Sequence, residues 1–444
     1  MRVSTGMIFD AGVVALNRQS AKMLHLQQQV ATGRRILTPS DDPVNAARAL
    51  EVTQSRDVVA QFKDNHNNAN SALGLAEAQL SSSNDLLVRI RELAVQGGNS
   101  SLTGDDRRSV AFELRARFEE LLGIANATDG SGNYIFSGYM GSTKPFGGTV
   151  DDTLAGNEIV YQGDDGQRRL QVSPTRYMEI SDSGNDVFKR IRNGNGYFST
   201  DYAKTNSGTA VIDAGSIMDT TKWNALANRK FDIAFSIDDT ALPPVTYYDI
   251  LDVDPNSPTV GNSLLTGAPP VLPPTAQSGQ RVYESGQPIT FKSQGSEPAF
   301  DLGGSVLING DPAAGDSFSI RPSTSQSVFS TIGKLIGALE GATTGNERSM
   351  TSLANDVGFS LTNLDQATDN ILRIRAQIGS RLGEVESLSN VNEDLGLQYQ
   401  QTLSQLQDLD YAKAITDLTR SQTDLDAAQK SFSMISRLSL FDKI

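Results

Sequence analysis

Residues 364–388 read LDQATDNILRIRAQIGSRLGEVESL, and apolar side chains recur along this stretch at alternating intervals of three and four residues. The same spacing continues on both sides, at Leu353, Val357, Leu364, Ala367, Ile371, Ile374, Ile378, Val385, Leu388, Leu395, Tyr399, Leu406 and Leu409. Four polar residues interrupt the stripe: Ser360, Arg381, Asn392 and Thr402. An average interval of about 3.5 residues sustained this far predicts a long helix that packs in coiled-coil fashion along a partner.

The spacing slips at Leu409, and a second stripe begins directly after it. Its members are Tyr411, Ala414, Leu418, Ser421, Leu425, Ala428, Phe432 and Ile435. Such a discontinuity marks the point where a helix changes its partner or its packing direction. We therefore place a domain boundary there.

The N-terminal end shows the same order of stripes. A short stripe of Val13, Leu16, Ser20, Met23, Gln27 and Val30 ends near Gly33, which is a plausible helix stop. After the segment Ile36–Pro43, where Ser40 or Asp41 could cap a helix with Pro43 in its first turn, a long stripe runs from Val52 to Ala94 and stops at Gly97. A third helix is predicted from about Asp105 to Ala125.

Each end thus carries a short outer stripe and a long inner one, so we expect outer to pack with outer and inner with inner. The outer segments are polar for a core, and an isolated helix pair of this quality is marginal in water. We expect these ends to be mobile in the monomer and to become ordered against other subunits. The predicted assembly residues are Val13, Leu16, Met23, Val30, Tyr411, Leu418, Leu425, Phe432 and Ile435.

The region between the helical ends has a different character. Of the 16 prolines, all except Pro39 and Pro43 lie between Pro145 and Pro322, and proline breaks helix interiors. Alternation predicts strands at 231–237 and 317–320, a glycine-bounded strand at 132–139, and a hairpin that joins 158–161 to 169–172. The middle therefore reads as one antiparallel β-rich insertion.

The predicted fold is α+β and multidomain: N- and C-terminal helices pair into a coiled-coil or bundled rod, and a β-rich domain is inserted into it. We assign residues 1–36 plus 410–444 to a terminal coiled-coil domain, mobile in the monomer. Residues 37–142 plus 326–409 form a helical rod domain with a short β hairpin. Residues 143–325 form the inserted outer domain.

Composition restricts the function classes. The chain has 444 residues, 38 Lys and Arg against 52 Asp and Glu, and a formal net charge of -14. This balance argues against nucleic acid and anionic membrane surfaces as partners. No apolar run approaches the roughly 20 residues that span a bilayer, and the N-terminus lacks the apolar core of a cleaved secretory signal. With no cysteine, disulfides, thiolate metal sites and cysteine nucleophiles are excluded.

Candidate chemical motifs are few, and we predict neither a cofactor, nor a metal site, nor a catalytic site. His66 lies on the inner stripe and is interpreted as a packing residue, and His25 has no ligand partner at metal spacing. The segment Asp252–Asn256 is similar to the start of an EF-hand loop, but Ser257 and Ser263 stand where glycine and glutamate are required. An ordinary loop is favoured there.

Two pairs of segments resemble the flagellin superfamily of bacterial flagella. At the front these are Gly33–Pro43 (GRRILTPSDDP) and Arg89–Gln96 (RIRELAVQ); at the back, Ile378–Glu384 (IGSRLGE) and Leu409–Gln422. The Ser-Asp-Asp-Pro element, the segment 132–139 and Tyr161-Gln162-Gly163-Asp164 favour a junction subunit over a filament flagellin. The resemblance covers roughly 1–175 and 326–444, and leaves most of 176–325 unmatched.

The resemblance implies a secreted, extracellular protein of the flagellum, exported unfolded through the type III apparatus without a cleaved signal. It implies a cytoplasmic chaperone on the C-terminal helix, and afterwards a homo-oligomeric ring between the preceding hook-associated protein and the first flagellins. It also implies subunit contacts at Arg89, Arg91, Glu92 and Gln96. Pro39, Ser40, Asp41, Asp42 and Pro43 would form a rigid interdomain loop.

Two other functions stay open at this stage. A filament flagellin would polymerise without limit when seeded, whereas a junction subunit should stop after it has capped the hook. An enzyme, such as a polysaccharide hydrolase in the β-rich domain, would need acidic residues that converge in a cleft.

Overall fold

The computed structural model describes residues 5–225, 230–270 and 279–441, apart from the side chains of Thr5, Ile8 and residues 435–441. The chain divides into two compact units. We name them the terminal unit (Met1–Asn68, Gln171–Thr175 and Val385–Ile444) and the body unit (Ala69–Leu170 and Arg176–Glu384). Two long helices, α2 (Pro43–Gly97) and α7 (Glu347–Gln407), contribute residues to both units.

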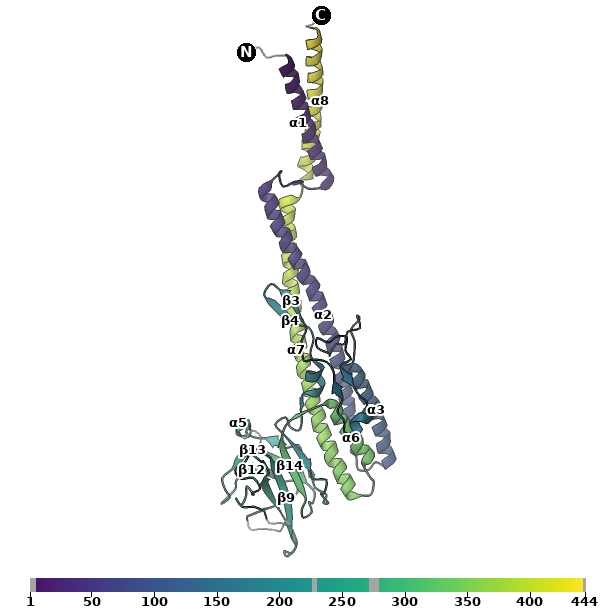
Figure 1. The fold of residues 1–444 in the computed structure, drawn as a ribbon, viewed down its shortest axis with the longest axis vertical. Coiled ribbons are helices and arrows are strands. Elements are labelled where there is room, and N and C mark those ends of the chain that lie inside the picture. The colour runs from purple at the N-terminus through teal and green to yellow at the C-terminus, as the bar shows by residue number, and fades with distance from the viewer. Residues whose placement is uncertain (1–4, 226–229, 271–278, 442–444) are drawn as a thin grey trace. The chain divides into compact units, whose positions relative to one another are not determined.

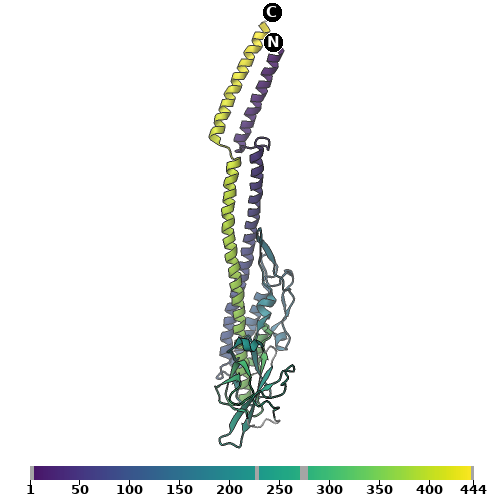
Figure 2. The same ribbon diagram turned by 90° about the vertical axis from the view of Figure 1, so that its left-hand side faces the viewer.

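Helices α1 (Thr5–Thr32) and α8 (Tyr411–Phe441) lie side by side in the terminal unit (Figures 1 and 2). Gly33 ends α1 as predicted: its φ is 70°, and its N–H donates to the carbonyl of Gln29 at 2.9 Å. The predicted slip near Leu409 is confirmed by the break between α7 and α8. The interior glycines of α7 do not interrupt this 61-residue helix.

The start of α2 differs from the prediction in its cap. Pro43 is the first helical residue, as expected, but neither Ser40 nor Asp41 caps the helix. The carboxylate of Asp42 accepts from the backbone N–H of Asn45 at 3.1 Å and caps it instead. The carboxylate of Asp41 instead accepts hydrogen bonds from the backbone N–H groups of Leu37 and Thr38, which precede it in the loop.

In the rest of the terminal unit, the first turns of α2 and the last turns of α7 share a thin core. Phe62 and Val385 are buried there, and the side-chain amide of Asn392 donates to the carbonyl of Val59 at 3.1 Å. His66 is buried, as predicted for a packing residue, and its Nε2 lies 2.7 Å from the carbonyl oxygen of Val172. That contact holds the turn at Gln171–Thr175 against α2.

The body unit packs α2 and α7 with two further helices. Helix α3 (Gly104–Ala125) begins with a capping box, in which Thr103 and Asp106 exchange side-chain and backbone hydrogen bonds, and it confirms the third predicted helix. Helix α6 (Val328–Gly341), which was not predicted from the sequence, is capped by Ser327 and is apolar on most of its surface. Leu73, Leu80, Leu87, Ile90, Phe118, Phe329, Ile332, Leu364, Ile371 and Ile378 form the core.

The four polar members of the α7 stripe all have partners. Ser360 and Thr402 donate to carbonyls one turn earlier, at 2.7 and 2.8 Å. Asn392 is bonded to Val59 as described above. Arg381 makes an ion pair with Asp182 at 2.9 Å in the body unit. Each interruption of the apolar stripe is therefore hydrogen-bonded, as partly buried polar groups need to be.

The chain between α3 and α6 consists of short strands and helices, and all of them lie in the body unit except the end of β3. Between α3 and α6 the chain forms β1 (Phe146–Gly147), α4 (Val150–Leu154), β2 (Val160–Tyr161), β3 (Arg169–Ser173), β4 (Arg176–Glu179), the π-helix η1 (Asn185–Lys189), β5 (Ile191–Arg192), β6 (Phe198–Tyr202), β7 (Val211–Ile212), β8 (Ser216–Ile217), α5 (Thr220–Ala225), β9 (Phe231–Asp238), β10 (Val245–Asp252), β11 (Arg281–Val282), β12 (Pro288–Lys292), β13 (Asp301–Asn309), β14 (Ser317–Pro322) and β15 (Ser325–Gln326).

Two antiparallel sheets enclose the β-rich core. One has the order β11-β10-β9-β14-β6, and the other has the order β12-β13-β7 with β8 also on β13. The predicted strands at 231–237 and 317–320 are confirmed as β9 and β14, which pair with each other. Asn355 of α7 joins this region to the helices, because its side chain accepts from the N–H of Ile212 at 3.0 Å and donates to the carbonyl of Ala210 at 3.3 Å.

Two strand predictions were wrong. Residues 132–139 form turns rather than a strand, because the Asp129 carboxylate takes the N–H groups of Ser131 and Asn133 at 2.8 and 2.9 Å. The predicted hairpin of 158–161 with 169–172 also does not form. Strand β2 pairs with β1, and β3 pairs with β4. The cause is the loop between β2 and β3, whose contacts are described with the candidate site.

Candidate functional site

The pair formed by α1 and α8 is the first candidate site. The rings of Phe9 and Phe432 lie 5.0 Å apart, centroid to centroid. Gly12 faces the Phe432 ring so closely that a Cβ atom on Gly12 would stand 2.7 Å from that ring. Further along, the side-chain amide of Gln19 donates to the carbonyl and the hydroxyl of Ser421 at 3.3 and 3.4 Å. Small and polar residues thus allow the two helices to approach closely.

Most of the residues predicted for assembly lie along this pair. Those that are partly buried are Val13, Leu16, Met23, Val30, Leu418, Leu425 and Phe432. Tyr411 is 52% exposed. Ile435 is in α8, but its side chain lies outside the described residues.

The stripe of α1 that faces α8 differs from the predicted one at alternate positions. Gly12, Gln19 and Leu26 are partly buried, whereas Ser20 and Gln27 are exposed. An α-helix has 3.6 residues per turn, so a stripe counted at an even 3/4 spacing drifts around the helix. The count alone could not decide between neighbouring positions. The apolar side chain of Leu26 was the available signal.

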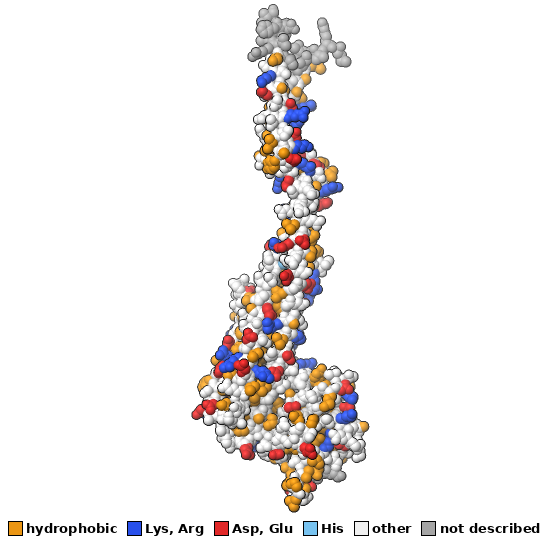
Figure 3. Space-filling model, turned by 180° about the vertical axis from the view of Figure 1, so that it is seen from behind, with side chains coloured by type: hydrophobic (Ala, Val, Ile, Leu, Met, Phe, Trp, Pro, Cys, Tyr) orange, Lys and Arg blue, Asp and Glu red, His pale blue; other side chains and the backbone are white. Residues whose placement is uncertain are grey.

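The α1–α8 pair leaves much apolar surface uncovered. Among its described residues only Ala414 and Ser421 are buried. Large apolar side chains that are about half exposed or more are Met7, Phe9, Val14, Leu24, Ile415 and Met434. Figure 3 shows hydrophobic side chains on the surface of these helices. Apolar surface of this extent is typical of a site that another molecule covers.

The connectors on either side of the pair are hydrogen-bonded to each other. Arg34 and Asp408 form an isolated β-bridge, and the N–H of Arg35 donates to the carbonyl of Gln407 at 2.7 Å. The N–H of Leu409 donates in return to the carbonyl of Gly33 at 3.0 Å. The two chain segments therefore change direction at the same level of the terminal unit.

The predicted loop Pro39–Pro43 is held by its two carboxylates. Hydrogen bonds from the backbone, that from Thr38 first, hold the pKa of Asp41 below its ordinary value, and Asn45 does the same for the pKa of Asp42. His25 of α1 also reaches Asp41, with Nε2 at 3.2 Å from the carboxylate. These contacts fit the predicted loop-stiffening role, and they tie the loop to α1.

The residues predicted for subunit contact in the body unit are engaged within the chain. Arg89 donates to Glu92 at 3.0 Å and to Glu113 of α3 at 2.9 Å. Arg91 binds Asp365 of α7 at 2.7 Å, and Gln96 is exposed. These pairs brace α2 against its neighbours.

Apolar side chains stand out on the same helices and were missed from the sequence. Val88 and Val95 of α2 are 45% and 54% exposed, and Phe112 of α3 is 71% exposed. Their position outside the buried stripe was the signal that could have revealed them. The surface that α2 and α3 offer to a partner is thus more apolar than the motif suggested.

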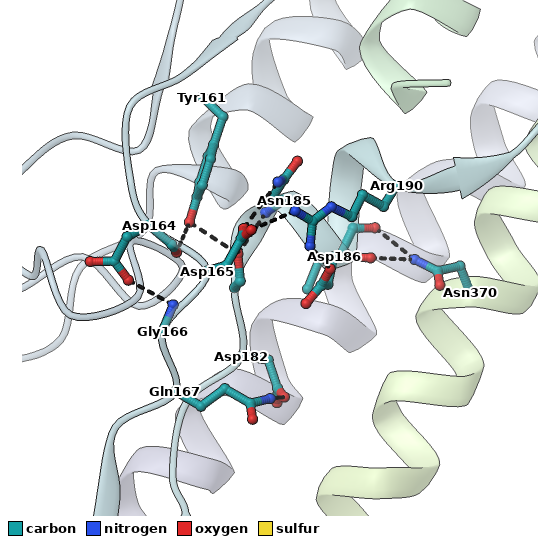
Figure 4. Close-up of polar contacts among 12 residues, drawn as sticks. Tyr161, Asp164, Asp165, Gly166, Gln167, Asp182, Asn185, Asp186, Arg190 and Asn370 are labelled. Atoms are coloured by element: carbon teal, nitrogen blue, oxygen red, sulfur yellow. Dashed lines mark hydrogen bonds and ion pairs between the residues drawn. The ribbon is translucent and has the colours of Figure 1, made fainter. Parts of the chain in front are cut away.

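A polar cluster around Tyr161 explains the rejected hairpin (Figure 4). The Tyr161 hydroxyl donates to the carbonyls of Phe136 and Asp164, at 3.0 and 2.8 Å. The Asp164 carboxylate accepts from the N–H groups of Tyr139 and Gly166 at 2.9 and 2.7 Å. The loop after β2 is therefore fixed to the turns at 136–139 and cannot close a hairpin with β3.

The cluster continues toward α7. The Asp165 carboxylate accepts from the Asn185 side chain at 3.0 Å and pairs with Arg190, and the bond from Asn185 is the main reason that the pKa of Asp165 is lowered. On α7, the amide of Asn370 donates to the carbonyl of Asp186 at 2.9 Å (Figure 4). The motif Tyr161–Asp164 thus belongs to a brace between loops and helix.

Among the residues that the structure describes, no group of three or more His, Asp or Glu side chains is placed to hold a metal ion. Asp252 is buried and accepts from the hydroxyls of Ser257 and Thr259. This contact makes the segment a closed turn, in agreement with the loop interpretation. Over the described ranges, no helix has both the length and the apolar character to cross a membrane.

Comparisons with known proteins agree with this architecture. Residues 3–140 match the family model of the bacterial flagellin N-terminal helical region. The crystal structure of flagellar hook associated protein-3 from Legionella pneumophila superposes with a TM-score of 0.67 at 29% identity, and the match covers 80% of this chain and 98% of that one. The N-terminal part of the chain is thus similar to that of flagellins, and its fold is similar to that of hook-associated protein 3.

The homologues that match over the most residues are named flagellar hook-associated protein 3, and a similar solved structure is that of the flagellar junction protein from Legionella pneumophila. The protein of that name from Escherichia coli K12 is 23% identical over 441 residues, 99% of both chains. The one from Salmonella typhimurium LT2 is 32% identical over 191 residues, and this match spans 43% of the present chain but only 58% of the relative. Flagellins are more distant: phase 1 flagellin of Salmonella naestved matches over 122 residues, 28% of this chain, at 29% identity.

Proposed function

We propose that this chain is a structural subunit of the bacterial flagellum that forms the junction between hook and filament. The observation that carries the proposal is the α1–α8 pair, whose described residues include only two buried side chains beside six large exposed apolar ones. Helices of this kind are completed by neighbouring copies. The similarity to hook-associated protein 3 along the length of the chain points to the same place in the flagellum.

The proposed partners follow from that place. Copies of the chain form a ring, with the preceding hook-associated protein on one side and the first flagellins on the other. Before export, a cytoplasmic chaperone covers α8, since its apolar surface would otherwise bind nonspecifically. The chain leaves the cell unfolded without a cleaved signal and works outside the cell, and the absence of cysteine is compatible with this route.

A filament flagellin is the less favoured candidate. The flagellin match covers 28% of the chain, whereas the hook-associated relative from Escherichia coli covers 99%. Seeded polymerisation separates the two: a junction subunit adds to hooks and stops, and a flagellin continues. We also propose that the chain has no enzymatic activity, and a turnover assay on polysaccharides tests this with the full-length protein.

The deciding experiment is deletion of the gene in its host, with complementation. We expect intact hooks without filaments and flagellin monomers in the medium. The full chain should restore attached filaments, and a chain that ends at Asp410 should not. Attached filaments in the deletion strain would exclude the junction role. Full restoration by the shortened chain would exclude α8 as the assembly element.

A further inference from the structure

The β9–β10 hairpin carries an apolar tip that contacts little of its own chain. Residues 239–244 connect Asp238 to Val245, which pair directly across the hairpin. Leu242 at the tip is 95% exposed, and Pro243 and Pro244 follow it, both exposed. The tip forms the lowest protrusion of the molecule in Figure 1, and Figure 3 shows hydrophobic side chains there. We name residues 239–244 the finger.

An apolar groove lies at the other end of β9. Its lining includes Phe231, the first residue of that strand, together with Leu264, Pro298, Ala299 and Phe300 from two loops. The groove has a volume of about 340 Å³. Pro298 and Ala299 are exposed at its mouth, whereas Phe231 is buried at its base.

The finger cannot fill the groove of its own chain. An eight-residue strand spans about 26 Å, and the two features lie at its two ends. The hairpin is also held in register over its whole length, from Val245–Asp238 to Asp252–Phe231, so the finger cannot fold back. A finger and a groove at opposite ends of one sheet suit a head-to-tail contact between copies, which closes into a ring when the rotation allows it.

The charges at the two features are complementary. Asp238 and Asp239 stand at the base of the finger, and hydrogen bonds from Thr240 lower the pKa of Asp238, which keeps it ionised. Two basic residues lie next to lining residues of the groove: Lys230 directly precedes Phe231, and Lys292 lies opposite Asp301 across the β12–β13 pair and, after Lys222, lowers the pKa of Asp301. Asp301 is itself neutralised by Lys222 at 2.7 Å. An acidic finger base and basic residues beside the groove would favour one orientation of docking between two copies.

We infer that the finger of one copy inserts into the groove of the next copy, so that the β-rich regions form a second ring contact besides the terminal helices. The inference rests on the proposed function only in that copies stand side by side in a ring. It gives the β9–β10 hairpin and the loops that line the groove, which have no assigned role from the sequence, a part in assembly. The occupant is a second copy of this chain, with Leu242 and its neighbouring prolines as the inserted group.

Disulfide trapping tests this directly, because the 444-residue chain has no cysteine of its own. The test variant is Leu242→Cys with Ala299→Cys in the full chain. Oxidation on assembled flagella should give linked dimers and larger species, whereas either single variant should give none. The matched control, Leu242→Cys with Val282→Cys, keeps a 55% exposed cysteine outside the groove and should stay monomeric.

A charge exchange sharpens the result. Asp239→Lys in the double-cysteine chain places like charges together and should lower the trapped fraction severalfold, and Lys230→Glu added to it should restore the yield. Filament attachment, scored in the same cells, reports the proposed function separately. Attached filaments without trapped species, or a disulfide formed within one chain, would overturn the inference and leave the junction role standing.

The purified full chain, oxidised at high concentration, gives a second measurement that does not need a flagellum. If the junction role fails and no flagella carry the chain, trapped multimers in this preparation still support the contact, and monomers alone overturn it.

Discussion

The α1–α8 pair and the helices of the body unit carry similar apolar stripes, but the stripes differ in how far they are buried. In the body unit Leu73, Leu80, Leu87 and Ile90 of α2 are fully buried, whereas every described apolar residue of α1 keeps part of its surface in solvent. In the body unit α6 packs against α3, α4 and η1, while α1 and α8 have chiefly each other. A stripe becomes a core only when enough partners surround it. The same spacing therefore encodes a finished domain in one region and an unfinished one in the other.

The largest effect should come from removing half of the unfinished pair. Deletion of 411–444 should abolish assembly onto hooks while the body unit stays folded, because its core draws on none of those residues. Circular dichroism and hook-binding assays measure the two outcomes. Loss of all helical signal on truncation would contradict the difference between the two regions.

One substitution made in both regions should give unequal costs. Leu87→Ala leaves a cavity in the body core and should lower the free energy of unfolding by about 2–5 kcal/mol. Leu418→Ala, at a partly buried position of α8, should cost about 1 kcal/mol or less in the monomer. Denaturant unfolding followed by circular dichroism tests both. Leu418→Ala should instead weaken assembly, and equal costs in the monomer would mean that the pair is already a complete core.

Acid should loosen the connector of the terminal unit. The native pKa of Asp41 is lowered, so its contribution to stability is present above the ordinary carboxyl pKa and is lost as pH falls through the native value. The amides of Leu37 and Thr38 should be protected from hydrogen exchange at pH 6 and should lose this protection only below the ordinary carboxyl pKa, as the pH falls through the lowered pKa of Asp41. Asp41→Asn should remove this difference.

Asp106 serves as the control in the body unit. Its pKa is lowered in the same way, by the side chain of Thr103 first and then by its backbone. Protection in the first turn of α3 should therefore fall with acid too, independently of Asp41→Asn. Protection of Leu37 and Thr38 that does not change with pH would exclude the carboxylate as their partner.

The smallest effect should follow from the ion pair between Arg91 and Asp365. Both side chains are about half exposed, so Arg91→Ala should change stability by about 0.2–1 kcal/mol at most. Thermal unfolding measures this, with Arg56→Ala on an exposed pair of the terminal unit as the control. Assembly that is weakened by Arg91→Ala without a loss of stability would support the predicted contact role. Unchanged assembly would leave the residue as an internal brace only.

The long helices and their breaks could be predicted from the sequence, because they depend on local spacing and on Gly33, Pro43 and Gly97. The stripe of α8 was predicted residue by residue from Ala414 to Phe432. That of α1 was half right, since Leu26 rather than Gln27 faces α8. Helix α6 was missed although its apolar residues recur at helical intervals.

Strand pairing was the weaker part, and the reason is non-local. The hairpin of 158–161 with 169–172 satisfied the local rules, but Tyr161 and Asp164 bind backbone groups of residues 136–139 instead. The contact motif at Arg89–Gln96 was recognised by resemblance alone. Spacing could not show that Glu113 and Asp365, from two other helices, engage its arginines.

The mutual hydrogen bonds between the connectors at Gly33–Arg35 and Gln407–Leu409 have a mechanical consequence. Two independent hinges would let each terminal helix swing by itself and dissipate any load. Because these bonds cross from strand to strand, a bend or twist imposed on one helix must carry the other with it. The two connectors would then act as a single pivot. Such a pivot transmits torque while its angle adapts, as a coupling in a rotating shaft requires.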